Sequence, residues 1–217
     1  MRDEQKISIQ FYTTNDYLLI NGLLWEESQD VLNEMIELIH TDGLAVMREA
    51  EQLGFDVRWK CSKEEGERLY KIYQDRFPTI LNDTTKDEII CRAKQDIQNL
   101  LSCMKPLNES LVLYRNIKSK FVKDIQEGDI LDYKGFSSCS LNPHIPENAM
   151  YGTRNSTFFE IIVNEETPVI RLDEMPDIAN ELDEIILPPS QFLITKIDKK
   201  NNKIFMKWIR HLNENHM

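Results

Sequence analysis

The spacing of hydrophobic and polar positions changes near residue 105. From about Asp16 to Cys103, apolar residues recur every three or four positions, as in VLNEMIELIH from Val31 and DEIICRAKQDIQNLL from Asp87. A hydrophobic period of about 3.6 residues is typical of amphipathic α-helices. The N-terminal half is therefore expected to be helical.

From Leu111 onward the apolar runs become short and rich in β-branched and aromatic residues. They are LVLYRNI, ILDYKGFSSCS, TFFEIIV, TPVIRL, EIILPP, QFLITKI and KIFMKWI. Turn residues separate these runs. Short runs of this composition between turns predict β-strands. Because neither a repeat nor a low-complexity linker divides the sequence, we expect an α+β fold, in which the N-terminal helical segment packs on a β core. The expected organisation is a single domain over 1–217, mainly helical in 1–105 and mainly β in 106–217.

Composition and charge exclude several classes of protein. The chain has 217 residues, of which 41% are hydrophobic, and this is enough to bury a core. Its net charge of −11 gives nucleic-acid phosphates little attraction, so we expect no nucleic-acid partner. No apolar run has the length of a signal peptide or a membrane span, so we expect neither a Sec-exported nor a membrane protein.

The cysteines and histidines show no spacing that is typical of a metal site or a disulfide framework, so no metal is expected. They are Cys61, Cys91, Cys103 and Cys139, and His40, His144, His211 and His216.

Two predicted strands carry residues that a plain core does not require. Arg115 lies within the apolar run LVLYRNI, where a buried guanidinium costs on the order of several kcal/mol unless an anion meets it. The segment GFSSCS places Ser138 and two further serines around Cys139, and such small donors suit close approach to a ligand or a carboxylate. Each feature alone also fits a plainer interpretation, namely an edge-strand arginine and a polar turn.

The order of these features resembles a known family. An apolar strand ending in Tyr114-Arg115, an aromatic-x-Ser-x-Ser strand and Glu184 before IILPP are similar to the Arg, Ser-x-Ser, Glu signature of the mono-ADP-ribosyltransferase toxin family. DYLLINGLLW from Asp16 resembles the start of a helix in that family, and FLITKIDKKNNKIFMKWI resembles its terminal strand hairpin. The resemblance covers most of the chain and implies two sheets that form a cleft for NAD.

The resemblance also implies a role for individual residues. Arg115 would bind the NAD phosphates and the adenosine ribose, and Ser138 would orient the catalytic glutamate. Cys139 stands where the family usually has threonine. MYGTRN resembles the nicotinamide loop, in which Tyr151 would stack on the base and Arg154 would contact phosphate. Without the resemblance, Tyr151 would be interpreted as an ordinary surface aromatic.

Three acids precede IILPP, and the register selects one of them. The catalytic glutamate of the family directly precedes an apolar pair, and Glu184 fits where Glu181 and Asp183 do not. In a strand, Glu184 shares a face with Leu182, whereas Asp183 points to the other face. By resemblance, Glu184 binds a hydroxyl of the nicotinamide ribose and stabilises the cation that forms as nicotinamide leaves.

The residue at position 182, a leucine, indicates which side chain can accept ADP-ribose. Two residues before the catalytic glutamate, arginine-modifying members have a second glutamate and asparagine-modifying members have glutamine. Leucine can neither accept a proton nor hold a guanidinium, and arginine, with a pKa above about 12, is a poor nucleophile without such help. We therefore expect transfer of ADP-ribose from NAD to a side chain other than arginine, on a protein of unknown identity.

Two alternatives stay open at this stage. Water could be the acceptor, which would make the protein an NAD glycohydrolase, or the chain could be an inactive binding module with the same fold. The resemblance implies a protein that is cytoplasmic in its producer or is delivered into a target-cell cytosol without the Sec route.

Overall fold

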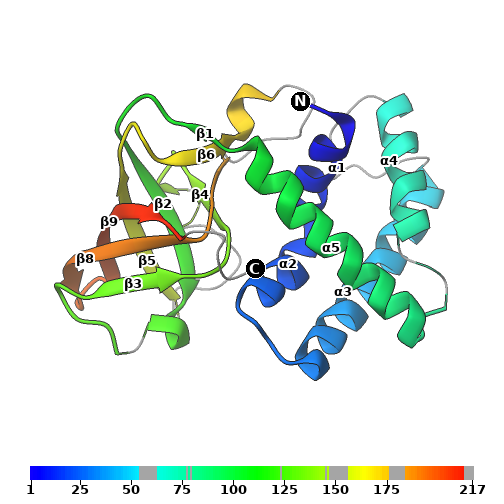
Figure 1. Ribbon diagram of the computed structural model, residues 1–217, viewed down its shortest axis with the longest axis horizontal. Coiled ribbons are helices and arrows are strands. Elements are labelled where there is room, and N and C mark those ends of the chain that lie inside the picture. The colour runs from blue at the N-terminus through cyan, green and yellow to red at the C-terminus, as the bar shows by residue number, and fades with distance from the viewer. Residues whose placement is uncertain are drawn as a thin grey trace. The chain divides into compact units, whose positions relative to one another are not determined.

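The structure is a computed structural model, and it describes residues 1–53, 63–76, 78, 80–122, 124–144, 146, 156–175 and 184–212. Helices come first along the described chain and strands follow (Figure 1). The chain forms two compact units, of which one contains Met1–Cys103 and the other contains Met104–Met175 and the strands from Glu184 onward. The predicted α+β class is confirmed, and the change from helix to sheet falls where the hydrophobic period changes. The single domain over the whole chain stays a prediction.

The helical unit has five α-helices among its described residues. They are α1 (Asp3–Phe11), α2 (Tyr17–Leu24), α3 (Gln29–Leu53), α4 (Lys63–Arg76) and α5 (Asp83–Cys103), with a π-helical turn (Tyr12–Asp16) between α1 and α2. Their apolar stripes form a core that includes Ile9, Ile20, Ile36 and Leu100, all fully buried. A Cβ atom added to Gly22 would lie 2.6 Å from the Met35 sulfur, so the glycine lets α2 approach α3 closely.

A charged cluster also lies inside the helical unit. The guanidinium of Arg76 contacts the carboxylate of Asp96, and its Nη2 lies 3.0 Å from Oδ2 of Asp16. All three side chains are buried. The hydroxyl of Ser8 donates a 2.7 Å hydrogen bond to the other oxygen of Asp96. Phe11 supports the Arg76 guanidinium, whose carbon is 4.3 Å from the ring centroid.

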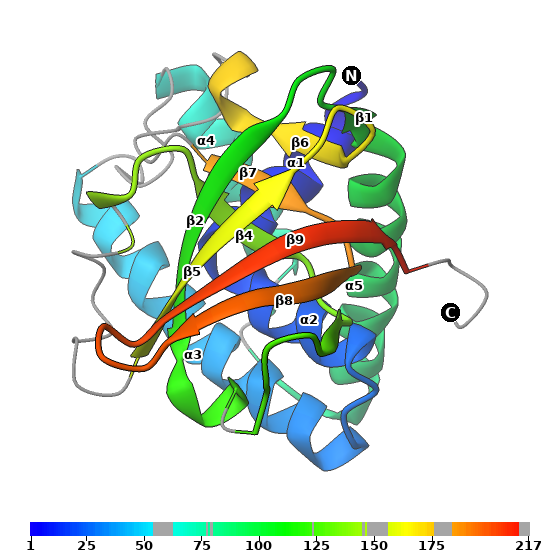
Figure 2. The same ribbon diagram turned by 90° about the vertical axis from the view of Figure 1, so that its left-hand side faces the viewer.

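The described part of the second unit contains nine strands in one sheet. They are β1 (Lys105–Pro106), β2 (Leu111–Lys118), β3 (Ile130–Tyr133), β4 (Ser137–Ser140), β5 (Ser156–Val163), β6 (Pro168–Arg171), β7 (Glu184–Leu187), β8 (Ser190–Asp198) and β9 (Lys203–His211). The spatial order is β1-β6-β7-β4-β2-β5-β9-β8-β3, in which β5 and β9 are parallel and the other neighbours are antiparallel. Figure 2 looks onto this sheet, where β2, β5, β9 and β8 lie side by side.

The sheet is almost divided between β2 and β4. These strands pair at one register position, Tyr114 with Ser140, whereas β2 pairs with β5 along its whole length, from Leu111 to Lys118. The family resemblance implied two sheets, and in the structure this single pair joins two groups of strands into one sheet. On its other side, β4 pairs with β7 at all four of its positions.

Alternate residues of the strands form the core of the second unit. Its largest members include Phe159, Phe192, Met206 and Trp208, and they pack with Cys139, Ile185 and Leu187 from β4 and β7. This burial fixes the register of β4 and β7, because a shift by one residue would turn every side chain to the other face. Among the described residues, no helix combines the length and the apolarity that crossing a membrane requires.

Candidate active site

Strands β4 and β7 bring Ser138 and Glu184 together. In their antiparallel register Ser140 is opposite Glu184, and Ser138 is opposite Ile186. Side chains that are opposite each other share a face of the sheet, so Ser138 and Glu184 lie on one face as diagonal neighbours. The hydroxyl of Ser138 donates a hydrogen bond to the Glu184 carboxylate. Cys139 and Ile185 point to the opposite face, into the core.

Arg115 approaches this pair from β2. It follows Tyr114, the residue of β2 that pairs with Ser140 of β4. Its Nη1 donates a 3.4 Å hydrogen bond to the backbone oxygen of Ser138, and its Nη2 donates a 3.1 Å hydrogen bond to the hydroxyl of Tyr133. The guanidinium carbon is 5.3 Å from the centroid of the Tyr133 ring. The charge of Arg115 is therefore held in the gap where β2 and β4 separate.

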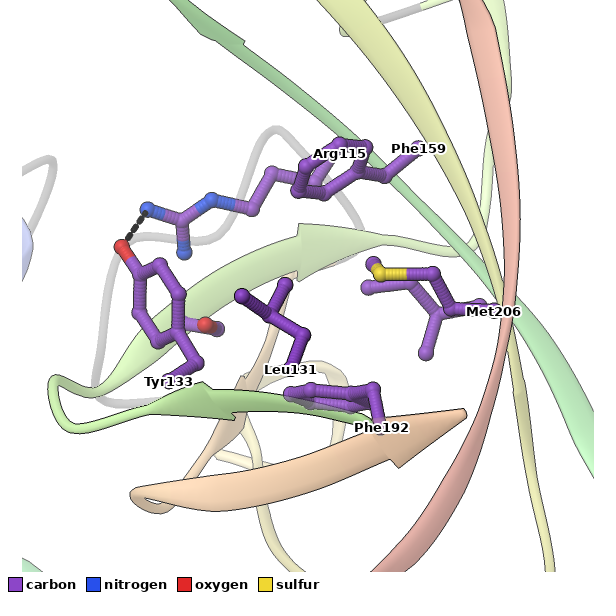
Figure 3. A pocket seen from close by; sticks show the side chains of 8 residues that line it. Arg115, Leu131, Tyr133, Phe159, Phe192 and Met206 are labelled. Atoms are coloured by element: carbon purple, nitrogen blue, oxygen red, sulfur yellow. Dashed lines mark hydrogen bonds between the residues drawn. The ribbon is translucent and has the colours of Figure 1, made fainter. Parts of the chain in front are cut away.

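Figure 3 shows the guanidinium of Arg115 and the ring of Tyr133 turned toward each other, with Leu131, Phe192 and Met206 nearby. The hollow beside Arg115 has a volume of about 10 Å³ and a mostly apolar lining. This is about the space of one water molecule, far below the few hundred Å³ that a small-molecule pocket typically has. A ligand as large as a dinucleotide therefore does not fit in this hollow.

The surroundings of Glu184 act on its ionisation in opposite directions. Burial raises the pKa of the carboxyl above its ordinary value, whereas the hydrogen bond from Ser138 and the charge of Arg115 lower it. Burial is the largest of these effects, so the pKa of Glu184 is raised overall. A carboxylate with a shifted pKa and a fixed hydrogen-bond donor is typical of an active site.

Cys139 lies behind the site. Burial raises the pKa of its thiol to about 12, although the nearby charge of Arg115 acts in the opposite direction. The thiol is therefore neutral at ordinary pH and fills space in the core, in the position where the family usually has threonine.

The structure thus brings together three of the residues that the sequence singled out, Arg115, Ser138 and Glu184. The other predicted site residues, Tyr151, Arg154 and Leu182, lie outside the described residues, and their roles stay predictions. Sequence reasoning missed Tyr133. Its only signal is the alternation in ILDY, which places it on the same face of β3 as Leu131.

Solved structures of ADP-ribosyltransferases have a similar fold. The ATR domain of Salmonella SpvB has a TM-score of 0.53 and 14% identity, covering 97% of this chain and 100% of that one. The catalytic domain of VahC from Aeromonas hydrophila has a TM-score of 0.52 and 14% identity, covering 96% and 100%. Vis of Vibrio splendidus, an ADP-ribosyltransferase solved in complex with agmatine, has a TM-score of 0.53 and 14% identity, covering 97% and 75%.

At the level of sequence, no protein-family model and no curated protein matches the chain significantly. The similarity to known proteins is therefore one of fold. The chain has the ADP-ribosyltransferase fold.

Proposed function

We propose that the protein is an NAD-dependent mono-ADP-ribosyltransferase, which transfers ADP-ribose from NAD to a protein side chain and releases nicotinamide. The observation that carries this proposal is the hydrogen bond from Ser138 to the carboxylate of Glu184, with the Arg115 guanidinium bound to the backbone of the same serine. The fold of the chain, which is similar to that of known ADP-ribosyltransferases, supports the proposal. The three residues are those to which the sequence resemblance gives a role in the site.

Arg115 supplies a cation for the diphosphate of NAD. A guanidinium has five donors in a planar fork, and it can bind two oxygens of a phosphate at once. In the structure, two of its nitrogens already bind Ser138 and Tyr133, which fixes the plane of the fork. Tyr151 and Arg154 are proposed to complete the site at the nicotinamide end of NAD.

Glu184 acts on the bond that breaks. When the bond between the ribose C1′ and the nicotinamide nitrogen cleaves, both electrons leave with nicotinamide, and the ribose becomes an oxocarbenium-like cation. The carboxylate of Glu184 binds a ribose hydroxyl and stabilises the positive charge. The acceptor then attacks C1′ and loses a proton. Ser138 keeps the carboxylate oriented and favours its charged form.

The acceptor is proposed to be a side chain other than arginine, because Leu182 cannot hold a guanidinium or take its proton. Agmatine, which Vis binds, carries the same guanidinium group as arginine and is a suitable probe. We expect this protein not to modify agmatine. The variant Leu182→Glu supplies the missing carboxylate and should gain some transfer to agmatine.

One assay tests the activity. The protein is incubated with NAD labelled in the adenylate part, with and without cell lysate, and both nicotinamide and labelled proteins are measured. The expected result is release of nicotinamide together with label on a protein band, both lost in Glu184→Gln. Release that is independent of lysate, with free ADP-ribose as the product, would instead indicate a glycohydrolase. Absence of release under both conditions would contradict an enzymatic function.

A further inference from the structure

We propose that Tyr133 is a positioning residue for Arg115, which holds the guanidinium in the orientation that binds the NAD diphosphate. This inference rests on the proposed function and adds to it a residue that the Arg, Ser-x-Ser, Glu order does not contain. Tyr133 acts through Arg115 and takes no part in bond cleavage.

The guanidinium of Arg115 is held at both ends by strands other than its own. Tyr133 on β3 accepts a hydrogen bond from Nη2 at 3.1 Å, and the backbone oxygen of Ser138 on β4 accepts one from Nη1 at 3.4 Å. The Tyr133 ring adds a cation-π contact, with 5.3 Å between the guanidinium carbon and the ring centroid. An arginine side chain that is already ordered loses less conformational entropy when a ligand binds, so its affinity for that ligand is higher.

Tyr133 is itself fixed by the sheet. It is the last residue of β3 and pairs with Ser190 of β8, which is fully buried. The Ser190 hydroxyl donates a 2.8 Å hydrogen bond to the backbone oxygen of Pro188 and accepts a 3.1 Å hydrogen bond from the indole of Trp208. The phenol of Tyr133 therefore extends from a rigid part of the backbone.

A short connection links Tyr133 to β4, the strand that carries Ser138. Four residues separate Tyr133 in sequence from Ser138, and one of them, Phe136, is fully buried. The hydroxyl of Tyr133 and the backbone oxygen of Ser138, which accept these two hydrogen bonds from Arg115, therefore belong to one continuous segment, and this segment also carries the donor to Glu184. Tyr133 thus sets the position of the Arg115 charge relative to the catalytic carboxylate.

The test is the variant Tyr133→Phe, which removes the hydroxyl and keeps the ring. We expect the Kd and the KM for NAD to rise about three- to tenfold, because a hydrogen bond to a charged group is lost. The value of kcat should stay within about twofold, since the contact is present both before and after bond breaking. A residue that only packs in the core would not produce this separation of KM from kcat.

A double-mutant cycle shows whether Tyr133 acts through Arg115. Arg115→Ala should weaken NAD binding more than Tyr133→Phe does, and adding Tyr133→Phe to Arg115→Ala should weaken it no further. Thr195→Val is a matched control. Thr195 is an exposed residue of β8, and its hydroxyl donates a 3.0 Å hydrogen bond to the backbone oxygen of Phe205 on β9. Loss of this hydrogen bond should leave both KM and kcat unchanged.

Several results would overturn the inference. They are an unchanged KM in Tyr133→Phe, a decrease in kcat alone, and additive effects in the double variant.

Folding of each variant is checked by circular dichroism and thermal unfolding, and NAD binding by calorimetry well below the unfolding transition. If the unmodified protein binds NAD and Tyr133→Phe binds it equally well, the role of Tyr133 fails and the proposed function stands. If the unmodified protein does not bind NAD, both fail.

Discussion

The hydroxyl of Ser138 donates a hydrogen bond to the carboxylate of Glu184 from the neighbouring antiparallel strand, across one diagonal step of the register. This contact opposes the effect of burial, which raises the pKa of Glu184. Because the carboxylate must be charged to stabilise a cation, the serine affects both the orientation and the ionisation of the catalytic group.

The first prediction concerns Ser138→Ala. Loss of the hydrogen bond should raise the pKa of Glu184 further, so the pH below which kcat/KM for nicotinamide release declines should move upward. Glu184 is active as the anion, so activity is lost as pH falls through its pKa, and in the unmodified protein this occurs above the ordinary range for glutamate. The measurement is kcat/KM for NAD over a series of pH values. Ser138→Thr keeps a hydroxyl and should preserve the profile. An identical profile in Ser138→Ala would show that the hydrogen bond does not control the ionisation.

The second prediction concerns Glu184→Gln. Glutamine keeps the volume of the side chain and removes its charge, so nicotinamide release should fall about a hundredfold while NAD still binds. The two quantities are measured by single-turnover kinetics and by calorimetry.

Two variants serve as controls for Glu184→Gln. Glu160→Gln removes a partly exposed carboxylate of β5 that pairs with Lys203 at 3.6 Å, and it should leave release nearly unchanged. Asp183→Asn should also have little effect, because the alternation along a strand predicts that Asp183 points to the other face. Full activity in Glu184→Gln together with loss in Asp183→Asn would show that the predicted register is wrong by one residue.

Much of the fold could be predicted because it follows local periodicity. The hydrophobic period changes near residue 105, and in the structure α5 ends at Cys103 and β1 begins at Lys105. The contact of Ser138 with Glu184, which are far apart in sequence, was expected from the resemblance to a known family. Alternation of side chains along the strand only selected Glu184 among the three neighbouring acids.

The contacts that sequence could not predict are those between polar side chains on different elements. Tyr133 binds Arg115 although β5, β9 and β8 lie between β2 and β3 in the order of the sheet, and no spacing along the chain indicates this contact. Similarly, Asp16, Arg76 and Asp96 look like residues of solvent-facing helix surfaces in the sequence, yet all three are buried together. Such contacts depend on how whole elements pack, which no local period specifies.

The third prediction concerns thiol reactivity. Burial raises the pKa of Cys139 to about 12, so almost no thiolate is present at pH 8, whereas Cys91 is exposed on α5. Because the thiolate is the reactive form, iodoacetamide should modify Cys91 in the folded protein and leave Cys139 intact. Peptide mapping by mass spectrometry distinguishes the two, and urea should expose Cys139. Equal labelling rates in the folded protein would contradict the burial of β4.

The last prediction concerns the buried carboxylate of Asp16. Burial raises its pKa from 3.8 to about 6, and the charge of Arg76 only partly offsets this effect. Its Oδ1 is buried and has no hydrogen-bond partner among the described residues, which is consistent with a carboxyl group that is costly to ionise. The folded protein therefore holds a proton on Asp16 at a pH where the unfolded chain has released it.

The sign of the pH dependence follows from this difference. The stabilising contribution of Asp16 is complete below its unfolded pKa of 3.8 and is lost as pH rises through about 6. The total change in the free energy of unfolding is about 3 kcal/mol.

Asp16→Asn cannot titrate, so between pH 4 and pH 7, roughly the span of these two pKa values, the unmodified protein should lose stability relative to the variant. Urea unfolding followed by circular dichroism at several pH values measures this difference. Asp87→Asn removes an exposed carboxylate from the same helical unit and should show no such trend. If Asp16→Asn also showed none, Asp16 would be ionised in the folded protein throughout this range, and its pairing with Arg76 would outweigh the cost of burial.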